Sequence, residues 1–175
     1  MSPPPGTPPV RPPAGPAWAS RGYADQVRAA MDEARRVAPG RGADGDVPIG
    51  ALVLDPDGAV LGRGHNVREE HADPTGHAEI VALRQAGEAL RSWRLAGCTL
   101  VVTLEPCAMC AGAAVLARVD RIVFGAWDEK AGACGSVWDL PRDRRSLHRV
   151  EVVGGVLAQE NADLLRDFFQ PHRLR

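Results

Sequence analysis

Apolar residues recur along this chain with two different periods, and each period predicts a type of secondary structure. Stretches in which apolar residues return every three or four positions predict amphipathic helices, as between Tyr23 and Val37. Short blocks rich in valine, isoleucine and leucine predict buried strands. The expected helices span residues 19–37, 77–90, 106–116 and 158–169, and the expected strands span residues 49–54, 59–67, 99–104, 121–125 and 149–153.

Turn signals and element order then predict the fold. The turn at residues 55–58, Asp-Pro-Asp-Gly, separates the first two strands, which we expect to form an antiparallel hairpin. The later strands alternate with helices, as in sheets whose strands are joined by crossover helices. The pattern predicts an α/β fold, a three-layer α/β/α sandwich around a mixed five-stranded sheet. Residues 68–76 and 126–148 have little period and are expected to be irregular.

The two ends of the chain differ in composition from the part between them. Residues 1–17 contain eight of the fifteen prolines, and so proline-rich a stretch cannot bury a core. We therefore expect a disordered tail over residues 1–18, one folded domain over residues 19–170, and a short basic tail over residues 171–175.

Composition is that of an ordinary globular protein, with 175 residues, 45% of them hydrophobic and 25% charged. We find no apolar run near the roughly 18 residues of a membrane span and no secretory signal, so we expect a cytoplasmic location. The net charge of −1 does not indicate nucleic-acid binding. Four arginines between residues 142 and 149 nevertheless form a local basic patch suited to phosphates, although a solvated loop explains them equally well.

The candidate chemistry lies in two separated pairs, His77 with Glu79 and Cys107 with Cys110. One imidazole and two thiolates are typical zinc ligands, and three protein ligands leave the fourth tetrahedral position open, as in catalytic sites. The start of a helix favours thiolates through its free N–H groups and its dipole. We therefore expect His77, Cys107 and Cys110 to bind Zn²⁺. Glu79 is then the general acid and base that serves a zinc-activated water.

Other interpretations of these residues stay open at the level of sequence. Two cysteines three apart are also typical of a redox pair, although the distant histidine fits that poorly. A structural zinc site would recruit a fourth ligand from Cys98, Cys134, His65 or His71. Glu79 alone would be typical of a helix start. Because nothing indicates a secreted disulfide framework, we expect Cys98 and Cys134 to be free packing residues.

With these motifs the chain resembles the bacterial tRNA-specific adenosine deaminases, the TadA family of the cytidine-deaminase-like superfamily. The resemblance covers about residues 23–169. It is carried by residues 46–51, 73–75, 77–80, 103–112, 123–126, 128–139 and 164–169. The zinc motif alone would indicate only the superfamily, whereas residues 130–136, Lys-Ala-Gly-Ala-Cys-Gly-Ser, indicate the tRNA enzymes.

The resemblance implies a zinc-dependent hydrolase with one Zn²⁺ per subunit that deaminates adenosine to inosine at the wobble position of a tRNA anticodon, with tRNA-Arg as the expected substrate. The base would be extruded into a pocket and attacked at C6. By the same resemblance, Asn66 contacts the flipped purine, and Asp128 and Lys130 hold the nucleotide and its neighbours. The expected partners are the tRNA anticodon stem-loop and a second copy of the chain in a homodimer. Trp127 either stacks on a nucleotide or packs against its own loop.

Two other functions compete with this one. A deaminase of a free base or nucleoside, such as cytosine or guanine, would use the same scaffold, and the near-neutral net charge favours it slightly. A non-catalytic RNA-binding subunit of a deaminase complex would not need Glu79, so the presence of that residue argues against it.

Overall fold

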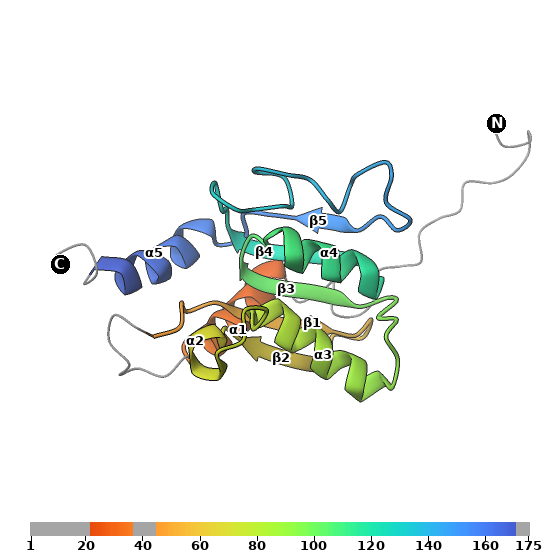
Figure 1. Ribbon diagram of the computed structural model, residues 1–175, viewed down its shortest axis with the longest axis horizontal. Coiled ribbons are helices and arrows are strands. Elements are labelled where there is room, and N and C mark those ends of the chain that lie inside the picture. The colour runs from red at the N-terminus through yellow and green to blue at the C-terminus, as the bar shows by residue number, and fades with distance from the viewer. Residues whose placement is uncertain (1–21, 37–44, 171–175) are drawn as a thin grey trace, which may run out of the picture.

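A single five-stranded sheet forms the centre of the molecule (Figure 1). The computed structural model describes residues 22–36 and 45–170. The strands are β1 (Gly50–Leu54), β2 (Val60–His65), β3 (Thr99–Leu104), β4 (Arg121–Ala126) and β5 (Glu151–Val153), in the spatial order β2-β1-β3-β4-β5. β1 runs antiparallel to β2 and β3, whereas β3, β4 and β5 run parallel. The mixed sheet expected from the sequence is confirmed, including the β1–β2 hairpin.

Helices cover both faces of this sheet (Figure 1). They are α1 (Tyr23–Ala34), α2 (Arg68–His71), α3 (Ala78–Leu90), α4 (Ala108–Ala117) and α5 (Ala158–Phe169). α3 and α4 pack on one face, and α1 packs on the other together with the segment that leads into α5. This arrangement confirms the three-layer α/β/α sandwich.

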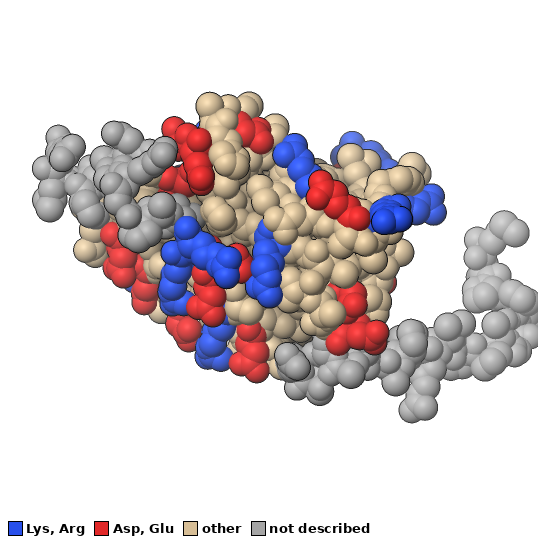
Figure 2. All heavy atoms as spheres, turned by 90° about the horizontal axis from the view of Figure 1, so that it is seen from below, with Lys and Arg blue, Asp and Glu red and all other residues tan. Residues whose placement is uncertain are grey.

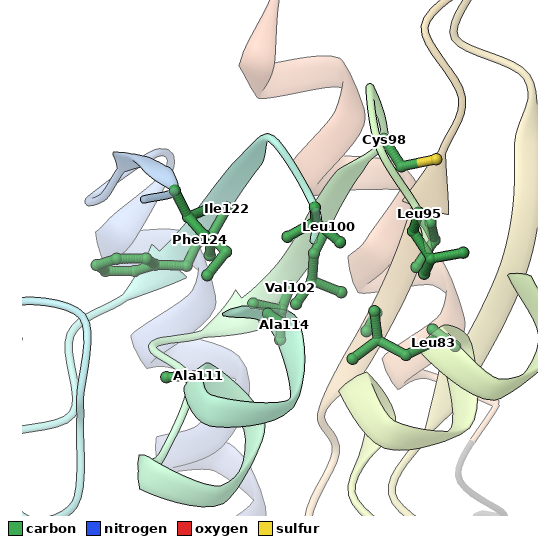
Figure 3. Close-up of a cluster of buried hydrophobic side chains, with 14 of the residues drawn as sticks. Leu83, Leu95, Cys98, Leu100, Val102, Ala111, Ala114, Ile122 and Phe124 are labelled. Atoms are coloured by element: carbon green, nitrogen blue, oxygen red, sulfur yellow. The ribbon is translucent and has the colours of Figure 1, made fainter. Parts of the chain in front are cut away.

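Two apolar clusters hold the layers together, one on each face. Successive residues of β3 alternate between them, because side chains of a strand point to opposite faces. Leu100 and Val102 belong to the larger cluster beneath α3 and α4, whereas Val101 belongs to the cluster beneath α1. Figure 3 shows the larger cluster, in which Leu83 of α3 and Ala114 of α4 point toward the sheet residues. Both faces of β3 are buried, so its sequence is a continuous apolar run.

Two glycines of β2 allow α3 to lie directly on the sheet. A Cβ atom added at Gly64 would lie 2.1 Å from the carbonyl oxygen of Ala78, and one added at Gly62 would lie 2.1 Å from that of Ala82. Real Cβ atoms essentially never approach another heavy atom closer than 3.0 Å. Only glycine fits at these positions, and Gly64 therefore fixes the height of the first turn of α3 above the sheet.

The structure departs from the sequence pattern at α2 and at the helix ends. α2 lies within the stretch expected to be irregular. The two carboxylate oxygens of Asp46 accept hydrogen bonds from the first turn of α2, one from the N–H of Glu69 (2.9 Å) and one from the N–H of Glu70 (3.0 Å). α3 and α4 end at Arg91 and Arg118 in the left-handed region, with φ of 49° and 64°, where glycine is usual. Such ends carry no sequence signal.

Several expectations fall outside the described part of the chain. These are the expected tails, 1–18 and 171–175, and residues 19–21 and 37 of the first expected helix. Within the described ranges, none of the helices has the length and apolar character of a membrane span. On the face seen in Figure 2, acidic and basic side chains lie interspersed, so that this face carries no extended field of one sign.

Candidate functional site

Three side chains bring metal-binding atoms together. The ligand atoms of His77, Cys107 and Cys110 all lie within 4.8 Å of one another. Nδ1 of His77 is 3.6 Å from Sγ of Cys107 and 3.5 Å from Sγ of Cys110. A tetrahedral zinc ion with bonds of about 2.0 Å to nitrogen and 2.3 Å to sulfur separates such ligands by about 3.5 Å. The group therefore fits one zinc ion as it stands.

Two helix starts position these three side chains. His77 directly precedes α3 and Cys107 directly precedes α4, both with extended backbone, while Cys110 lies in the first turn of α4. The N–H of Ala111 donates to the carbonyl of Cys107 (2.8 Å), which fixes that first turn. The expectation that both halves of the motif lie at helix starts is confirmed.

Among the residues the structure describes, no fourth protein ligand joins the group. Cys98, Cys134, His65 and His71, the candidates for a structural zinc site, are not part of it. Three ligands with one open position are the arrangement of catalytic zinc. Cys98 and Cys134 are free and buried, and burial raises the pKa of the Cys98 thiol to about 11. Their expected packing role is confirmed.

The electrostatics of the group favour a thiolate. The pKa of the Cys107 thiol is lowered to about 4. The largest cause is a hydrogen bond from Cys110, and a hydrogen bond from His77 lowers this pKa further. The hydrogen bond between the two thiols raises the pKa of Cys110, and the hydrogen bond to Cys107 raises the pKa of His77. Cys107 is therefore the thiol that loses its proton first, in the form that zinc requires.

Glu79 lies in the first turn of α3, two residues after His77, and only 4% of it is exposed. Desolvation by burial raises the pKa of this carboxyl group from 4.5 to about 7. A group whose pKa lies near neutral both accepts and releases a proton readily. A buried carboxyl group with such a pKa is able to exchange protons near neutral pH, and the general acid and base role of Glu79 stays a prediction.

Asn66 lies beside the segment that leads into His77. Its N–H donates to the carbonyl of Ile49 (3.1 Å), and the N–H of Val67 donates to the carbonyl of Gly76 (2.8 Å). Only 6% of Asn66 is exposed, and its Oδ1 has no hydrogen-bond partner among the described residues. A buried, unpaired carbonyl oxygen costs about 1–3 kcal/mol, so this atom is suited to a ligand that donates to it.

The segment from Asp128 to Ser136, here called the 128–136 loop, lies against the start of α4. Gly132 forms an isolated antiparallel bridge with Cys107. The N–H of Ala133 donates to the carbonyl of Pro106 (2.8 Å). The loop is therefore adjacent to the metal-binding group.

Asp128 and Lys130 occupy different positions within this loop. Oδ1 of Asp128 accepts hydrogen bonds from the N–H groups of Lys130 (3.0 Å) and Ala131 (3.2 Å), so that the Asp128 carboxylate shapes the turn of the loop itself. Lys130 is exposed. Both residues belong to the loop that contacts the start of α4, and the hydrogen bonds of Asp128 give it a loop-forming role.

The other side chains considered for RNA contact are partly engaged within the protein. The ring of Trp127 packs edge-to-face against the buried ring of Phe124, with 4.8 Å between the ring centroids. This contact favours a packing role for Trp127 over stacking on a nucleotide. In the basic patch, Arg142 pairs with Asp139 (2.7 Å) and Arg145 pairs with Asp143 (2.7 Å). These partners reduce the charge that the patch presents.

One polar residue of the site was not singled out by the sequence analysis. Glu105 is 2% exposed and directly precedes Pro106 at the end of β3. Its carboxylate accepts three backbone hydrogen bonds from the 128–136 loop. The only sequence signal was an acidic residue immediately after an apolar strand, which does not identify its partners.

Comparisons with known proteins agree with this geometry. The family model for the cytidine and deoxycytidylate deaminase zinc-binding region matches residues 24–126. The chain is 47% identical to the tRNA-specific adenosine deaminase of Bacillus subtilis, over 82% of this chain and 88% of that protein. It is also 50% identical, over 87% of its length, to the tRNA(Ile)-lysidine synthase of Deinococcus radiodurans, but it spans only 26% of that longer protein.

A solved structure points the same way. It comes from a study of A-to-I editing by tRNA:A34 deaminases at the wobble position, and it covers 81% of this chain and 99% of its own, with a TM-score of 0.71 and 39% identity. The family model covers more than half of the chain and includes all three ligands of the metal-binding group together with Glu79. The chain belongs to the cytidine and deoxycytidylate deaminase family of zinc-binding deaminases, and it is similar to the tRNA-specific adenosine deaminases within it.

Proposed function

We propose that this protein deaminates adenosine to inosine at the wobble position of a tRNA anticodon, with tRNA-Arg as the first substrate to test. The observation that carries the proposal is the three-ligand group next to the buried carboxyl of Glu79. The similarity to tRNA-specific adenosine deaminases, which extends past residue 126 through the 128–136 loop, supports the choice of substrate.

His77, Cys107 and Cys110 would hold the zinc ion, which would supply the Lewis acidity that lowers the pKa of a water molecule. Glu79 takes a proton from the attacking water and delivers it to N1 of the adenine ring. Glu79 then takes the second proton, from the hydroxyl group now on C6, and passes it to the amine that leaves C6. A carbon–oxygen bond replaces a carbon–nitrogen bond, so that water and adenosine give inosine and ammonia. The near-neutral pKa of Glu79 suits both directions of transfer.

Substrate contacts come from two segments, the end of β2 and the 128–136 loop. The unpaired Oδ1 of Asn66 accepts a hydrogen bond from the extruded purine. Lys130, exposed on the 128–136 loop, contacts the phosphates of the neighbouring nucleotides, and Asp128 holds the turn that presents it.

One deaminase domain spans residues 19–170, between tails at residues 1–18 and 171–175, and acts in the cytoplasm, where its tRNA substrate is found. The domain forms a homodimer. Leu116 and Leu147 are 71% and 92% exposed, and Leu116 borders a hollow of about 330 Å³ beside α4 that a second copy would cover.

The deciding experiment uses the zinc-loaded protein and a tRNA-Arg anticodon stem-loop with adenosine at the wobble position. Inosine is read by sequencing, and ammonia release is measured in parallel with free adenosine, cytosine and guanine. A stem-loop with the adenosine moved by one position is the matched substrate control. Inosine at the wobble position alone is the expected result. Ammonia from a free base without inosine in the stem-loop would show that the protein is a free-base deaminase.

A further inference from the structure

Glu105 is a buried acidic residue whose three hydrogen-bond donors all belong to one loop. Oε2 accepts from the N–H of Asp128 (3.1 Å), and Oε1 accepts from the N–H groups of Cys134 (2.9 Å) and Ser136 (3.0 Å). Burying a carboxylate is costly unless hydrogen bonds replace its water. Here backbone N–H groups at both ends of the 128–136 loop replace that water.

The backbone of Glu105 is connected to the metal ligand Cys107. Its backbone N–H donates to the carbonyl of Ala126 (2.8 Å), which joins β3 to β4, and its carbonyl side leads through Pro106 to Cys107. Any change in the position of the Glu105 carboxylate relative to the loop therefore changes the position of the loop relative to the metal ligands.

The loop closes on Glu105 without free space. A Cβ added at Gly132 would lie 2.3 Å from Oε2 of Glu105 and 2.3 Å from Oγ of Ser136. The hydroxyl of Ser136 in turn donates to the carbonyl of Asp128 (2.7 Å), so the two ends of the loop meet over the carboxylate. Three amide hydrogen bonds and this close packing therefore attach the loop to the Glu105 carboxylate.

We propose that Glu105 is a positioning residue for substrate recognition, which holds the 128–136 loop, and with it Lys130, at a fixed place beside the metal-binding group. This inference rests on the proposed function for the identity of the substrate. Glu105 does not touch the reacting atoms. Its substitution raises the KM for the tRNA stem-loop while zinc binding and the turnover of bound substrate persist.

The Glu105→Gln variant tests this at nearly constant shape. If the amide oxygen keeps the two hydrogen bonds of Oε1, the amide NH₂ faces the N–H of Asp128, and two donors then oppose each other. At least one of the three hydrogen bonds is lost in either orientation. Because hydrogen bonds to a charged acceptor are the strong ones, we expect a KM increase of about tenfold.

Glu33→Gln is the matched control. Glu33 is also a buried carboxylate, 3% exposed, but it lies on α1 and pairs with Arg63 (3.0 Å) and Arg36 (3.5 Å), away from the loop. The measurements on both variants and on the unaltered chain are amide hydrogen exchange at residues 128–136 without substrate, zinc per chain, and KM and kcat on the stem-loop. A general loss of stability would change exchange throughout the protein and would affect both variants.

For Glu105→Gln we expect faster exchange of the Asp128 amide, one zinc ion per chain, a raised KM and a nearly unchanged kcat. Unchanged exchange in the loop, loss of zinc, or a fall in kcat at constant KM would each overturn the proposal. If Glu105→Gln does not fold, Gly132→Ala tests the proposal instead. Its added Cβ would push the loop away from the Glu105 carboxylate while Glu105 itself stays intact, so KM should rise equally. Faster amide exchange in the loop of Glu105→Gln would support the attachment of the loop to Glu105 even if the unaltered chain made no inosine. The absence of inosine would then refute the proposed substrate alone.

Discussion

Gly64→Ala changes the height of α3 above the sheet at the turn that carries Glu79. The added Cβ would lie 2.1 Å from the carbonyl oxygen of Ala78 and 2.8 Å from the backbone N of Ala82, whereas real Cβ contacts essentially begin at 3.0 Å. The first turn of α3 must therefore move by about 0.9 Å or more, because both obstacles are backbone atoms.

This displacement has two measurable consequences. Overpacking of this kind costs about 1–3 kcal/mol of unfolding free energy. For a domain of this size, each kcal/mol lowers the melting temperature by about 2–4 °C. A misplacement of about 1 Å at a reacting group is able to reduce turnover about a hundredfold, and Glu79 is the residue after Ala78.

Gly62→Ala is the matched control, because its Cβ would meet the carbonyl oxygen of Ala82 at the same distance, one turn further along α3. Melting temperature by calorimetry, zinc per chain and inosine formation are measured for both variants. We expect similar losses of stability but a much larger loss of turnover for Gly64→Ala. Equal losses of turnover, or an unaltered melting temperature for Gly64→Ala, would refute the argument that Gly64 sets the position of the first turn.

Three further predictions address the site itself. Glu79→Gln should keep one zinc ion per chain and lose about 10²–10⁴-fold in kcat, because proton transfer is lost, and an active variant would exclude the proton-shuttle role. Cys110→Ala, or treatment of the unaltered chain with a chelator, should remove zinc and lower the melting temperature, and full zinc content in the variant would exclude Cys110 as a ligand. Asn66→Ala should reduce kcat/KM about tenfold or more without changing zinc content, and an unchanged kcat/KM would exclude a contact with the purine.

The regular elements of the fold were predictable because periodicity is a local property. β3 reads as a continuous apolar run since both of its faces are buried, and the two halves of the metal-binding motif stand at helix starts as expected. α2 was missed because what fixes its first turn is the carboxylate of Asp46, more than twenty residues upstream. Arg91 and Arg118 end their helices without the glycine that normally signals such ends.

The metal-binding residues of the candidate site were predictable from the sequence, whereas the hydrogen bonds that hold the neighbouring loop were not. His77, Cys107 and Cys110 are recognised by residue type and spacing, which need no contact information. The role of Glu105 depends on amides 23–31 residues away and leaves no local pattern. In the basic patch, Arg142 pairs with Asp139, which lies outside residues 142–149, so the sequence of the patch does not show this partner.

The 128–136 loop contacts the segment that leads into α4 at Glu105, at the carbonyl of Pro106 and at Cys107. The residues proposed for the hydrolysis itself all lie between residues 77 and 110, at the starts of two helices on one face of the sheet. Insertions on the exposed side of the loop would therefore leave the hydrolytic group intact. In such an architecture, a change on the exposed side of the loop alters the contacts proposed for Lys130 and leaves in place the residues proposed for the hydrolysis.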